Sequence, residues 1–372
     1  MIRAHKIRLT PTPEQEVYFK KASGTARFVY NWALAQWQTV HAANPGIAYG
    51  MMAAKKEFNR LKGEQFPWIY DVAKDVCEGA FANLGAALKN YFNGKKGQRK
   101  GEKVGFPKFK SKKRSKQSFR LNNDKFTVDG HHLRIPNLGW VNMAEELRFQ
   151  GKIMGAVVSK VADWWFVSIT VEVEKPAPIL WEKESIGVDL GVKTLATLSG
   201  GREFENQKLL RSELNKLCKL NRSLARRNQG SNRWHKAKRR LGRFHKRISD
   251  RRCDITHKMT TTIATTYCTV GVEDLNVKGM GKSRRLSLSI SDASLSDILR
   301  QLAYKAEWFG GQVVKVGRFF ASSKMCSECG HVNKDLKLSD RKWACQGCRT
   351  IHDRDWNASK NIEREALRLV NV

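Results

Sequence analysis

Two cysteine pairs, Cys326–Cys329 and Cys345–Cys348, constrain the fold of this chain more than any other feature. Each pair has the form Cys-x-x-Cys, and fifteen residues separate them. This spacing is typical of a structural zinc ribbon, in which four thiolates surround one Zn²⁺. We therefore expect residues 322–351 to fold around one structural zinc ion. The other cysteines are scattered singly, which suits small apolar fillers in a reducing cytosol. They are Cys77, Cys218, Cys253 and Cys268.

Three acidic residues stand where regular structure would hold them rigidly. Asp189 and Glu273 each follow a short apolar strand pattern, and Asp355 opens the pattern of the final helix. Two magnesium ions bridged by such carboxylates activate water and stabilise the leaving oxygen in phosphodiester cleavage. Any one of these acids alone would be explained better as a helix cap or a surface ion pair. A nuclease site therefore requires a fold that brings the three together.

The charge of the chain indicates a polyanionic partner. Lys and Arg number 69 against 35 Asp and Glu, a net charge of +34. Nucleic acid is the first candidate; a protein that merely coats phosphate and a basic membrane-binding surface are the alternatives. The 41% hydrophobic content, with 11 Trp and 17 Phe, favours packed cores over a disordered basic tail. The sequence has no membrane-spanning run and no signal peptide, so we expect a cytoplasmic protein associated with the nucleoid.

The pattern of the first half predicts a sheet and a helical bundle. Residues 2–9 read as a strand, and Thr12 reads as the N-cap of a helix, with Pro13 at its first position and Gln15 closing a capping box. The pattern stays helical to about residue 92. Residues 121–175 then alternate with period two, which predicts an antiparallel sheet or barrel that the first strand joins.

Two segments are strongly cationic. Residues 93–120 hold twelve Lys or Arg and one acid, Glu102, and include aromatic residues. Residues 208–252 hold seventeen Lys or Arg and two acids, with leucine and aromatic spacing that predicts a helical hairpin. Such segments bind nucleic acid by charge and stacking, whereas the alternative is a solvated linker or surface. The candidate contacts are Lys108, Lys110, Arg226, Arg227, Arg239, Arg240, Arg243, Lys246 and Arg247.

Several motifs together resemble the TnpB family, the transposon-encoded ancestors of type V CRISPR effectors. Residues 187–191, residues 272–275 and the ribbon followed by residues 352–358 are similar to the three RuvC-like motifs of that family. Four further segments also resemble that family, so the resemblance extends over essentially the whole chain: residues 27–31, 104–109, 138–140 and 288–292. The resemblance implies that Asp355, rather than Asp353, is the third catalytic acid.

The resemblance implies an α+β multidomain fold. A helical recognition bundle (residues 14–92) would be inserted in an oligonucleotide-binding-like wedge barrel (residues 1–13 and 93–178). An RNase H-like, RuvC-type α/β nuclease domain (residues 183–321) would follow, with the zinc ribbon (residues 322–351) inserted before the final motif and helix (residues 352–372). Asn357 would orient a loop of the site, and His352 is best explained as a cap or as packing for the ribbon.

The implied activity is RNA-guided cleavage of double-stranded DNA beside a short transposon-adjacent motif, which promotes retention and spread of an insertion sequence. The implied partners are a guide RNA from the transposon end, with one protein per RNA, and the target DNA of a prokaryotic cell. Two Mg²⁺ would bind at Asp189, Glu273 and Asp355. The candidates for reading the motif are Tyr49, Lys74 and Asn122. A nuclease-inactive RNA-guided repressor and an RNA-free DNA-binding transposition accessory protein remain alternatives.

Overall fold

The computed structural model describes residues 1–370 apart from residues 48, 100, 102 and 338. The chain divides into two compact units, Met1–Glu174 and Lys175–Val372. Each unit has its own sheet and its own hydrophobic core, so each is described by itself below.

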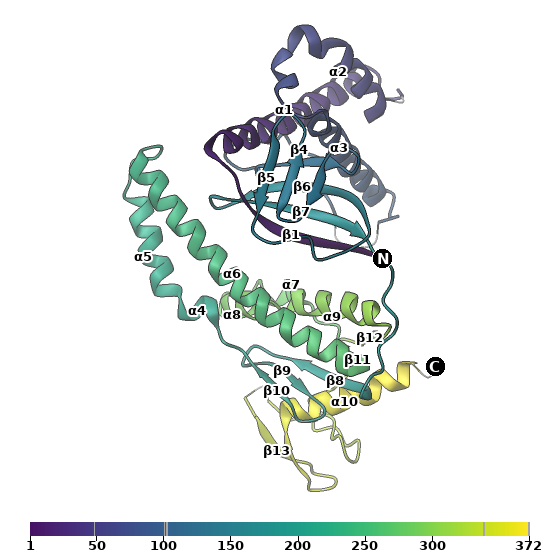
Figure 1. Ribbon diagram of the computed structural model, residues 1–372. Helices are drawn as coiled ribbons and strands as arrows, with labels where there is room; N and C mark the ends of the chain where they lie inside the picture. Colours follow the sequence, from purple (N-terminus) through teal and green to yellow (C-terminus); the bar gives the residue numbers. More distant parts are fainter. Residues whose placement is uncertain (48, 100, 102, 338, 371–372) are drawn as a thin grey trace. The chain divides into compact units, whose positions relative to one another are not determined.

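The first unit is built on a seven-stranded antiparallel sheet (Figure 1). Its order is β2-β6-β7-β1-β5-β4-β3. The strands are β1 (Ile2–Thr10), β2 (Ser118–Asn122), β3 (Thr127–Asp129), β4 (His132–Ile135), β5 (Gly139–Met143), β6 (Lys152–Val161) and β7 (Trp164–Glu172). The prediction that the first strand joins this sheet is confirmed, because β1 pairs with β7 from Ile2 to Leu9. The order ends at β2 and β3, and closure into a barrel stays a prediction.

Over its described residues, this unit also contains three α-helices and a short 3₁₀ helix. They are α1 (Pro13–Ala43), α2 (Met51–Gln65), η1 (Pro67–Asp71) and α3 (Lys74–Lys95). The predicted capping box is confirmed: the Gln15 backbone N–H donates to the Thr12 side chain, and the Gln15 side chain accepts from the Thr12 backbone. Phe19 of α1 anchors the helix on the sheet, with its ring centroid 5.0 Å from that of the buried Trp165.

The second unit holds a five-stranded mixed sheet in the order β10-β9-β8-β11-β12. The strands are β8 (Lys183–Leu190), β9 (Thr194–Leu198), β10 (Glu203–Glu205), β11 (Tyr267–Glu273) and β12 (Gln312–Val316). The first three run antiparallel, whereas β11 lies parallel to both β8 and β12. The carboxyl ends of β8, β11 and β12 therefore lie at one edge of the sheet.

Helices cover both faces of this sheet (Figure 1). The helices of this unit are α4 (Leu209–Ser212), α5 (Leu214–Ala225), α6 (Asn232–Thr266), α7 (Val277–Met280), α8 (Ser287–Ala293), α9 (Leu295–Phe309) and α10 (Arg354–Val370). Of these, α6, α9 and α10 pack directly on the strands, whereas α5 packs on α6. Side chains of α6 and α9 form one core with Ile186 and Val188 of β8. Residues alternate between the faces of a strand, and α10 packs against the opposite face.

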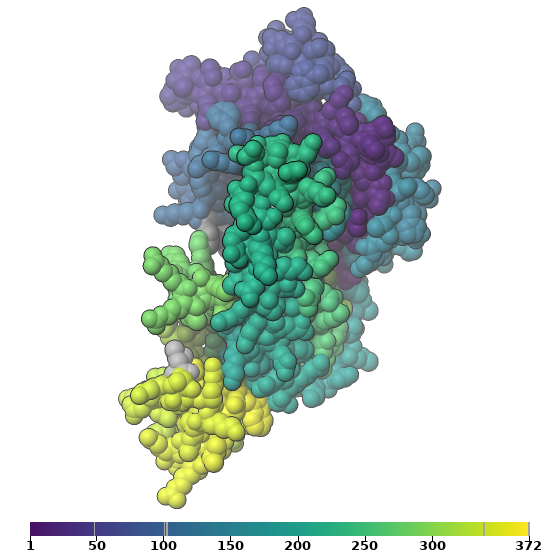
Figure 2. Space-filling view, turned by 90° about the vertical axis from the view of Figure 1, so that its left-hand side faces the viewer, coloured from purple at the N-terminus to yellow at the C-terminus, as the bar shows by residue number. Residues whose placement is uncertain are grey.

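The predicted helical hairpin is present as α5 and α6, but its second arm is longer than expected. The prediction ended at residue 252, whereas α6 continues to Thr266. The added turns are helical because Met259 and Ile263 pack in the core over the sheet. Figure 2 shows the hairpin as a continuous ridge on the face toward the viewer.

A small two-stranded sheet, β13 (Lys342–Ala344) and β14 (Ile351–Asp353), flanks the second cysteine pair and precedes α10. Through β14, the cysteine-rich segment continues directly into the last helix. Over the described residues, none of the helices has the length and apolar character needed to cross a bilayer.

Candidate functional site

Adjacent parallel strands bring Asp189 and Glu273 together. Val188 of β8 is the register partner of Val272 of β11, so the acid that follows each valine lies at the same carboxyl edge. Neither acid is fully buried, which leaves the edge accessible. The sequence prediction that these two carboxylates converge is supported by this register.

Two glycines allow α10 to lie directly on these strands. A Cβ added at Gly187 would lie 1.9 Å from the carbonyl oxygen of Ser359, and one at Gly271 would lie 2.7 Å from the Cβ of Ala366. Each glycine precedes an acid by two residues and so shares its face of the sheet. The acids therefore face the side on which α10 lies, with Asp355 in its first turn.

The pKa of Asp189 shows that the three acids share one electrostatic environment. Burial, followed by the charges of Glu273 and Asp355, raises the pKa of Asp189 to about 7, against opposing effects of Arg354 and Arg341. A cluster of carboxylates that disfavours its own ionisation is stabilised by a hard cation such as Mg²⁺. The three carboxylates thus fit divalent ions, although their oxygens are not gathered as closely as the sulfurs of the four cysteines.

Arg341 and Ser322 contact two of the acids and were missed by the sequence analysis. The Nη1 of Arg341 donates to both carboxylate oxygens of Asp355, at 3.1 and 3.0 Å. The Ser322 hydroxyl donates to Oε1 of Glu273, and its carbonyl accepts from the Asn361 amide at 2.8 Å. No local pattern marks either residue, because each reaches its acid through the fold of the cysteine-rich segment.

Asp353 makes different contacts from Asp355. Its carboxylate accepts hydrogen bonds from the backbone N–H groups of Asp355 and Trp356, each at 3.1 Å. It therefore caps the N-terminus of α10 and fixes the first turn, on which Asp355 lies.

The four cysteines form a compact cluster. In the part of the chain that the structure describes, theirs is the one group of three or more His, Cys, Asp or Glu side chains whose ligand atoms all lie within 4.8 Å of one another. The Sγ–Sγ distance is 3.6 Å for Cys326 and Cys348, and also for Cys329 and Cys345. Tetrahedral Zn–S bonds of about 2.3 Å place sulfurs roughly 3.8 Å apart, so this geometry fits a zinc ion.

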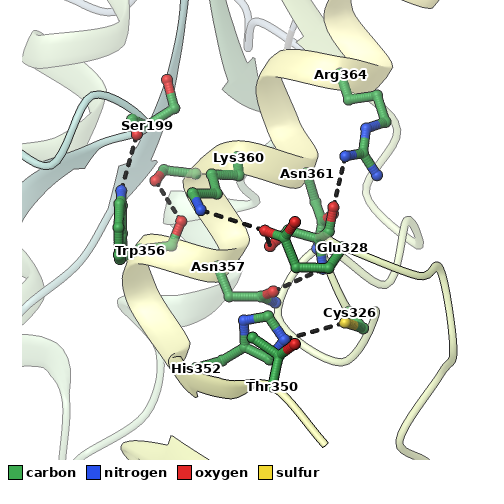
Figure 3. A network of polar contacts seen from close by, with 12 residues as sticks. Ser199, Cys326, Glu328, Thr350, His352, Trp356, Asn357, Lys360, Asn361 and Arg364 are labelled. Carbon is green, nitrogen blue, oxygen red and sulfur yellow. Dashed lines mark hydrogen bonds and ion pairs between the residues drawn. The ribbon is translucent and has the colours of Figure 1, made fainter. Parts of the chain in front are cut away.

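The last helix is fastened to the cysteine-rich segment by a polar network (Figure 3). The Asn357 side chain accepts from the Ser327 N–H at 2.9 Å and donates to the Met325 carbonyl at 2.7 Å, which confirms that it orients this loop. His352 is buried, with Nε2 3.0 Å from Cys326 Sγ. Its ring lies 4.9 Å from that of Trp343, consistent with packing for the ribbon.

The three candidates for motif reading lie in the first unit. Lys74 begins α3, and Asn122 ends β2. Both approach Glu78: the Asn122 amide donates to it at 3.0 Å, and the Lys74 ammonium lies 4.0 Å away. Tyr49 instead donates to Glu57 at 2.8 Å. The structure thus groups Lys74 with Asn122 and gives Tyr49 a separate contact.

The basic segment 93–120 is partly docked rather than free. The Asn31 side chain binds both the carbonyl and the N–H of Lys110, each at 2.8 Å. Phe106 packs against Trp37, with ring centroids 5.7 Å apart, and joins the core of the helices. Lys108 is exposed. Lys110 lines a cavity of about 460 Å³ whose lining includes four cations and no carboxylate.

The candidate cations of the hairpin are mostly exposed. Arg226 follows the end of α5, and Arg227 donates to the Ser223 carbonyl. The four candidate arginines of α6 are exposed: Arg239, Arg240, Arg243 and Arg247. Lys246 differs, because it forms an ion pair with Asp250 one turn away. Their apolar neighbours Phe244 and Ile248 are buried against α5 and α4 residues, including Leu217 and Leu209.

Family models match three parts of the chain. The model described as "Probable transposase" (OrfB_IS605) matches residues 168–284, and the "Cas12f1-like, TNB domain" model matches residues 296–362. A "Helix-turn-helix domain" model matches residues 1–45, which here form β1 and the single long helix α1.

Close relatives cover nearly the whole chain. It is 33% identical over 379 residues to the "Putative RNA-guided DNA endonuclease InsQ" of Escherichia coli (strain K12), covering 97% of this chain and 91% of that protein. A relative of the same description from Streptomyces pristinaespiralis is 33% identical over 367 residues, covering 97% and 88%. The chain therefore belongs to the TnpB (OrfB_IS605) family of RNA-guided DNA endonucleases.

A solved structure supports the same fold. The cryo-EM structure of the Cas12f1–sgRNA–target DNA complex matches with a TM-score of 0.55 and 16% identity, covering 94% of this chain and 82% of that one. At this identity the match concerns the fold alone, and it agrees with the predicted α+β class.

Proposed function

We propose that this protein is an RNA-guided endonuclease that cleaves double-stranded DNA with Asp189, Glu273 and Asp355 as its catalytic acids. The observation that supports the proposal is their convergence: Asp189 and Glu273 lie at the same end of adjacent parallel strands, and Asp355 lies in the first turn of the helix that packs on those strands. A nuclease-inactive repressor would not require three clustered carboxylates, which disfavour one another's ionisation. An RNA-free accessory protein is disfavoured by the family to which the chain belongs.

The surrounding residues prepare the carboxylates for metal binding. The three acids would hold two Mg²⁺ ions, which supply an activated water and stabilise charge on the leaving oxygen. The Ser322 hydroxyl donates to one oxygen of Glu273 and so orients that carboxylate. Arg341 forms an ion pair with Asp355 and orients its carboxylate.

One structural zinc ion is assigned to Cys326, Cys329, Cys345 and Cys348. Its role would be to hold the loop that supplies Ser322 and the hairpin that supplies Arg341. The ribbon contributes to the nuclease site in this way, in addition to stabilising its own fold.

The nucleic-acid contacts are divided between the units. The exposed cations of α6 and the docked basic segment near Lys110 would hold the guide RNA, derived from the transposon end, and its heteroduplex with DNA. In the first unit, the helices would form the recognition domain and the sheet the wedge barrel. Lys74, Asn122 and Tyr49 are the candidates there for reading the adjacent motif. One protein would bind one RNA.

The test is purification followed by cleavage. RNA of defined sequence should co-purify, and the complex should cut matching DNA beside one short motif in the presence of Mg²⁺. Asp189→Ala should abolish cleavage while guide and target binding stay within about twofold, because only a metal ligand is removed. Absence of bound RNA would support the accessory protein, and wild-type cleavage by Asp189→Ala would exclude this site.

A further inference from the structure

An aromatic ring is displayed to solvent beside the carboxylate edge. The side chain of Phe319 is 96% exposed, whereas most large apolar side chains of the chain are buried or half-buried. Phe319 belongs to the segment that follows β12, the strand paired with the end of β11. The register places Val316 beside Glu273, so Phe319 lies three residues beyond the position of that acid.

The backbone around this ring is fixed on both sides. Phe320 N–H donates to the Gly317 carbonyl at 3.0 Å, which closes a turn with Arg318 and Phe319 at its centre. Arg318 donates to the backbone carbonyl and the carboxylate of Asp274, at 3.1 and 2.7 Å. On the other side, Phe320 packs in the cluster of Val316 and Ile362. An ordered turn thus holds the Phe319 side chain in solvent.

The same segment also serves the catalytic acid. Ser322, three residues after Phe319, is buried and donates to Glu273. The Ser322 N–H donates to the Phe320 carbonyl at 2.8 Å. The exposed ring is therefore connected through a short hydrogen-bonded turn to the side chain that orients Glu273.

An apolar ring held in water beside a polar reaction site is suited to stacking. Base–aromatic stacking is independent of sequence, because every base has a π-face, but it requires a base whose face is not already covered in a duplex. We propose that Phe319 stacks on an unpaired base of the DNA strand presented to Asp189, Glu273 and Asp355, and positions that strand for cleavage. This inference rests on the proposed DNA cleavage.

The experiment compares Phe319→Ala, Phe319→Trp and wild type as RNA-bound complexes. Single-turnover cleavage is measured over a range of target DNA concentrations. Stacking of about 1–3 kcal/mol per base corresponds to a roughly 5- to 150-fold loss in the rate at limiting DNA for Phe319→Ala. Phe319→Trp should retain near wild-type rates. Leu180→Ala is the matched control, because Leu180 is an equally exposed apolar side chain of the same unit, at 99%.

A second series locates the stacked base. Single abasic sites are placed along the DNA strand that does not pair with the guide. One abasic position should reduce the wild-type rate to that of Phe319→Ala and leave the variant unchanged. Equal rates for Phe319→Ala and wild type on intact DNA would overturn the inference, as would additive losses at every abasic site. Failure of wild type itself to cut would instead overturn the proposed function.

Discussion

The two strands of the site repeat one three-residue pattern, glycine, valine and acid. The valines, Val188 and Val272, are fully buried in the core on one face, and the acids face the other. Gly187 and Gly271 keep that face flat enough for the backbone of α10 to approach. In each strand, the valine therefore packs in the core, the glycine allows α10 to approach closely and the acid supplies a carboxylate.

Gly187→Ala should destabilise the second unit and abolish cleavage. The added Cβ would meet the Ser359 carbonyl at 1.9 Å and the Glu363 N–H nitrogen at 2.6 Å, so α10 must shift and carry Asp355 with it. Overpacking of this kind costs about 1–3 kcal/mol or more. Thermal unfolding and DNA cleavage check the result. Gly200→Ala is the control, because its nearest neighbour would be 3.9 Å away; equal behaviour of the two variants would contradict the prediction.

Asp189→Asn should stabilise the folded chain at neutral and higher pH when divalent ions are absent. Because its pKa is raised to about 7, ionised Asp189 opposes folding. Stability from this group is full below the unfolded-state pKa of about 4 and is lost as the pH rises toward 7. The variant should therefore melt several degrees above wild type at pH 8 and near wild type at pH 4. A melting difference that is the same at both pH values would be evidence against this linkage.

Among the elements, the cysteine-rich segment shows what sequence can and cannot predict. The four cysteines were identified by spacing alone, because a metal site with fixed ligand count imposes its pattern locally. The contact of Arg341 with Asp355 depends instead on the pairing of β13 with β14, where Lys342 is opposite Asp353. Nothing in the neighbouring residues encodes that pairing.

Cys329→Ser should reduce zinc from one ion per chain to less than half and lower the melting temperature. It should also reduce cleavage at saturating Mg²⁺, because Arg341 and Ser322 are both held by the zinc-bound segment. Elemental analysis, thermal unfolding and cleavage assays check these outcomes. Cys218→Ser, on the surface of α5, is the control and should retain its zinc. Zinc bound at wild-type level in Cys329→Ser would refute the ligand assignment.

The exposed cations of the α5–α6 hairpin lead to a prediction about the salt dependence of RNA binding. Neutralising Arg239, Arg240 and Arg247 to Gln should weaken RNA binding and flatten its dependence on salt, because all three are exposed cations of α6. The slope of log K against log salt should fall by about 0.7–0.9 for each phosphate that the variant no longer neutralises. Lys258→Gln is the control on the same helix, since Lys258 already pairs with Asp254 at 2.8 Å. An unchanged slope in the triple variant would show that these arginines face solvent in the complex.

At the scale of the whole molecule, the sequence predicted the presence of the sheets better than the extent of the elements. Alternation in β7 and the capping box at Thr12 are local signals, and both were confirmed. The predicted end of α6 was wrong, because Met259 and Ile263 continue the helix by packing in the core against strands distant in sequence. Barrel closure could not be read from alternation, since it depends on which edge strands meet.

The chain divides between Glu174 and Lys175. Exchanging the first unit between relatives can therefore test motif preference separately from DNA cleavage. Replacing residues 1–174 with those of a relative that cuts beside a different motif should transfer the motif preference. The proposed catalytic acids and zinc ligands all lie in the second unit, so the cleavage rate on a preferred motif should stay within about tenfold of wild type. Sequencing of cut sites in a randomised target library measures the preference. If the preference instead follows residues 175–372, then Lys74, Asn122 and Tyr49 do not read the motif, and the basis for its recognition lies in the nuclease unit.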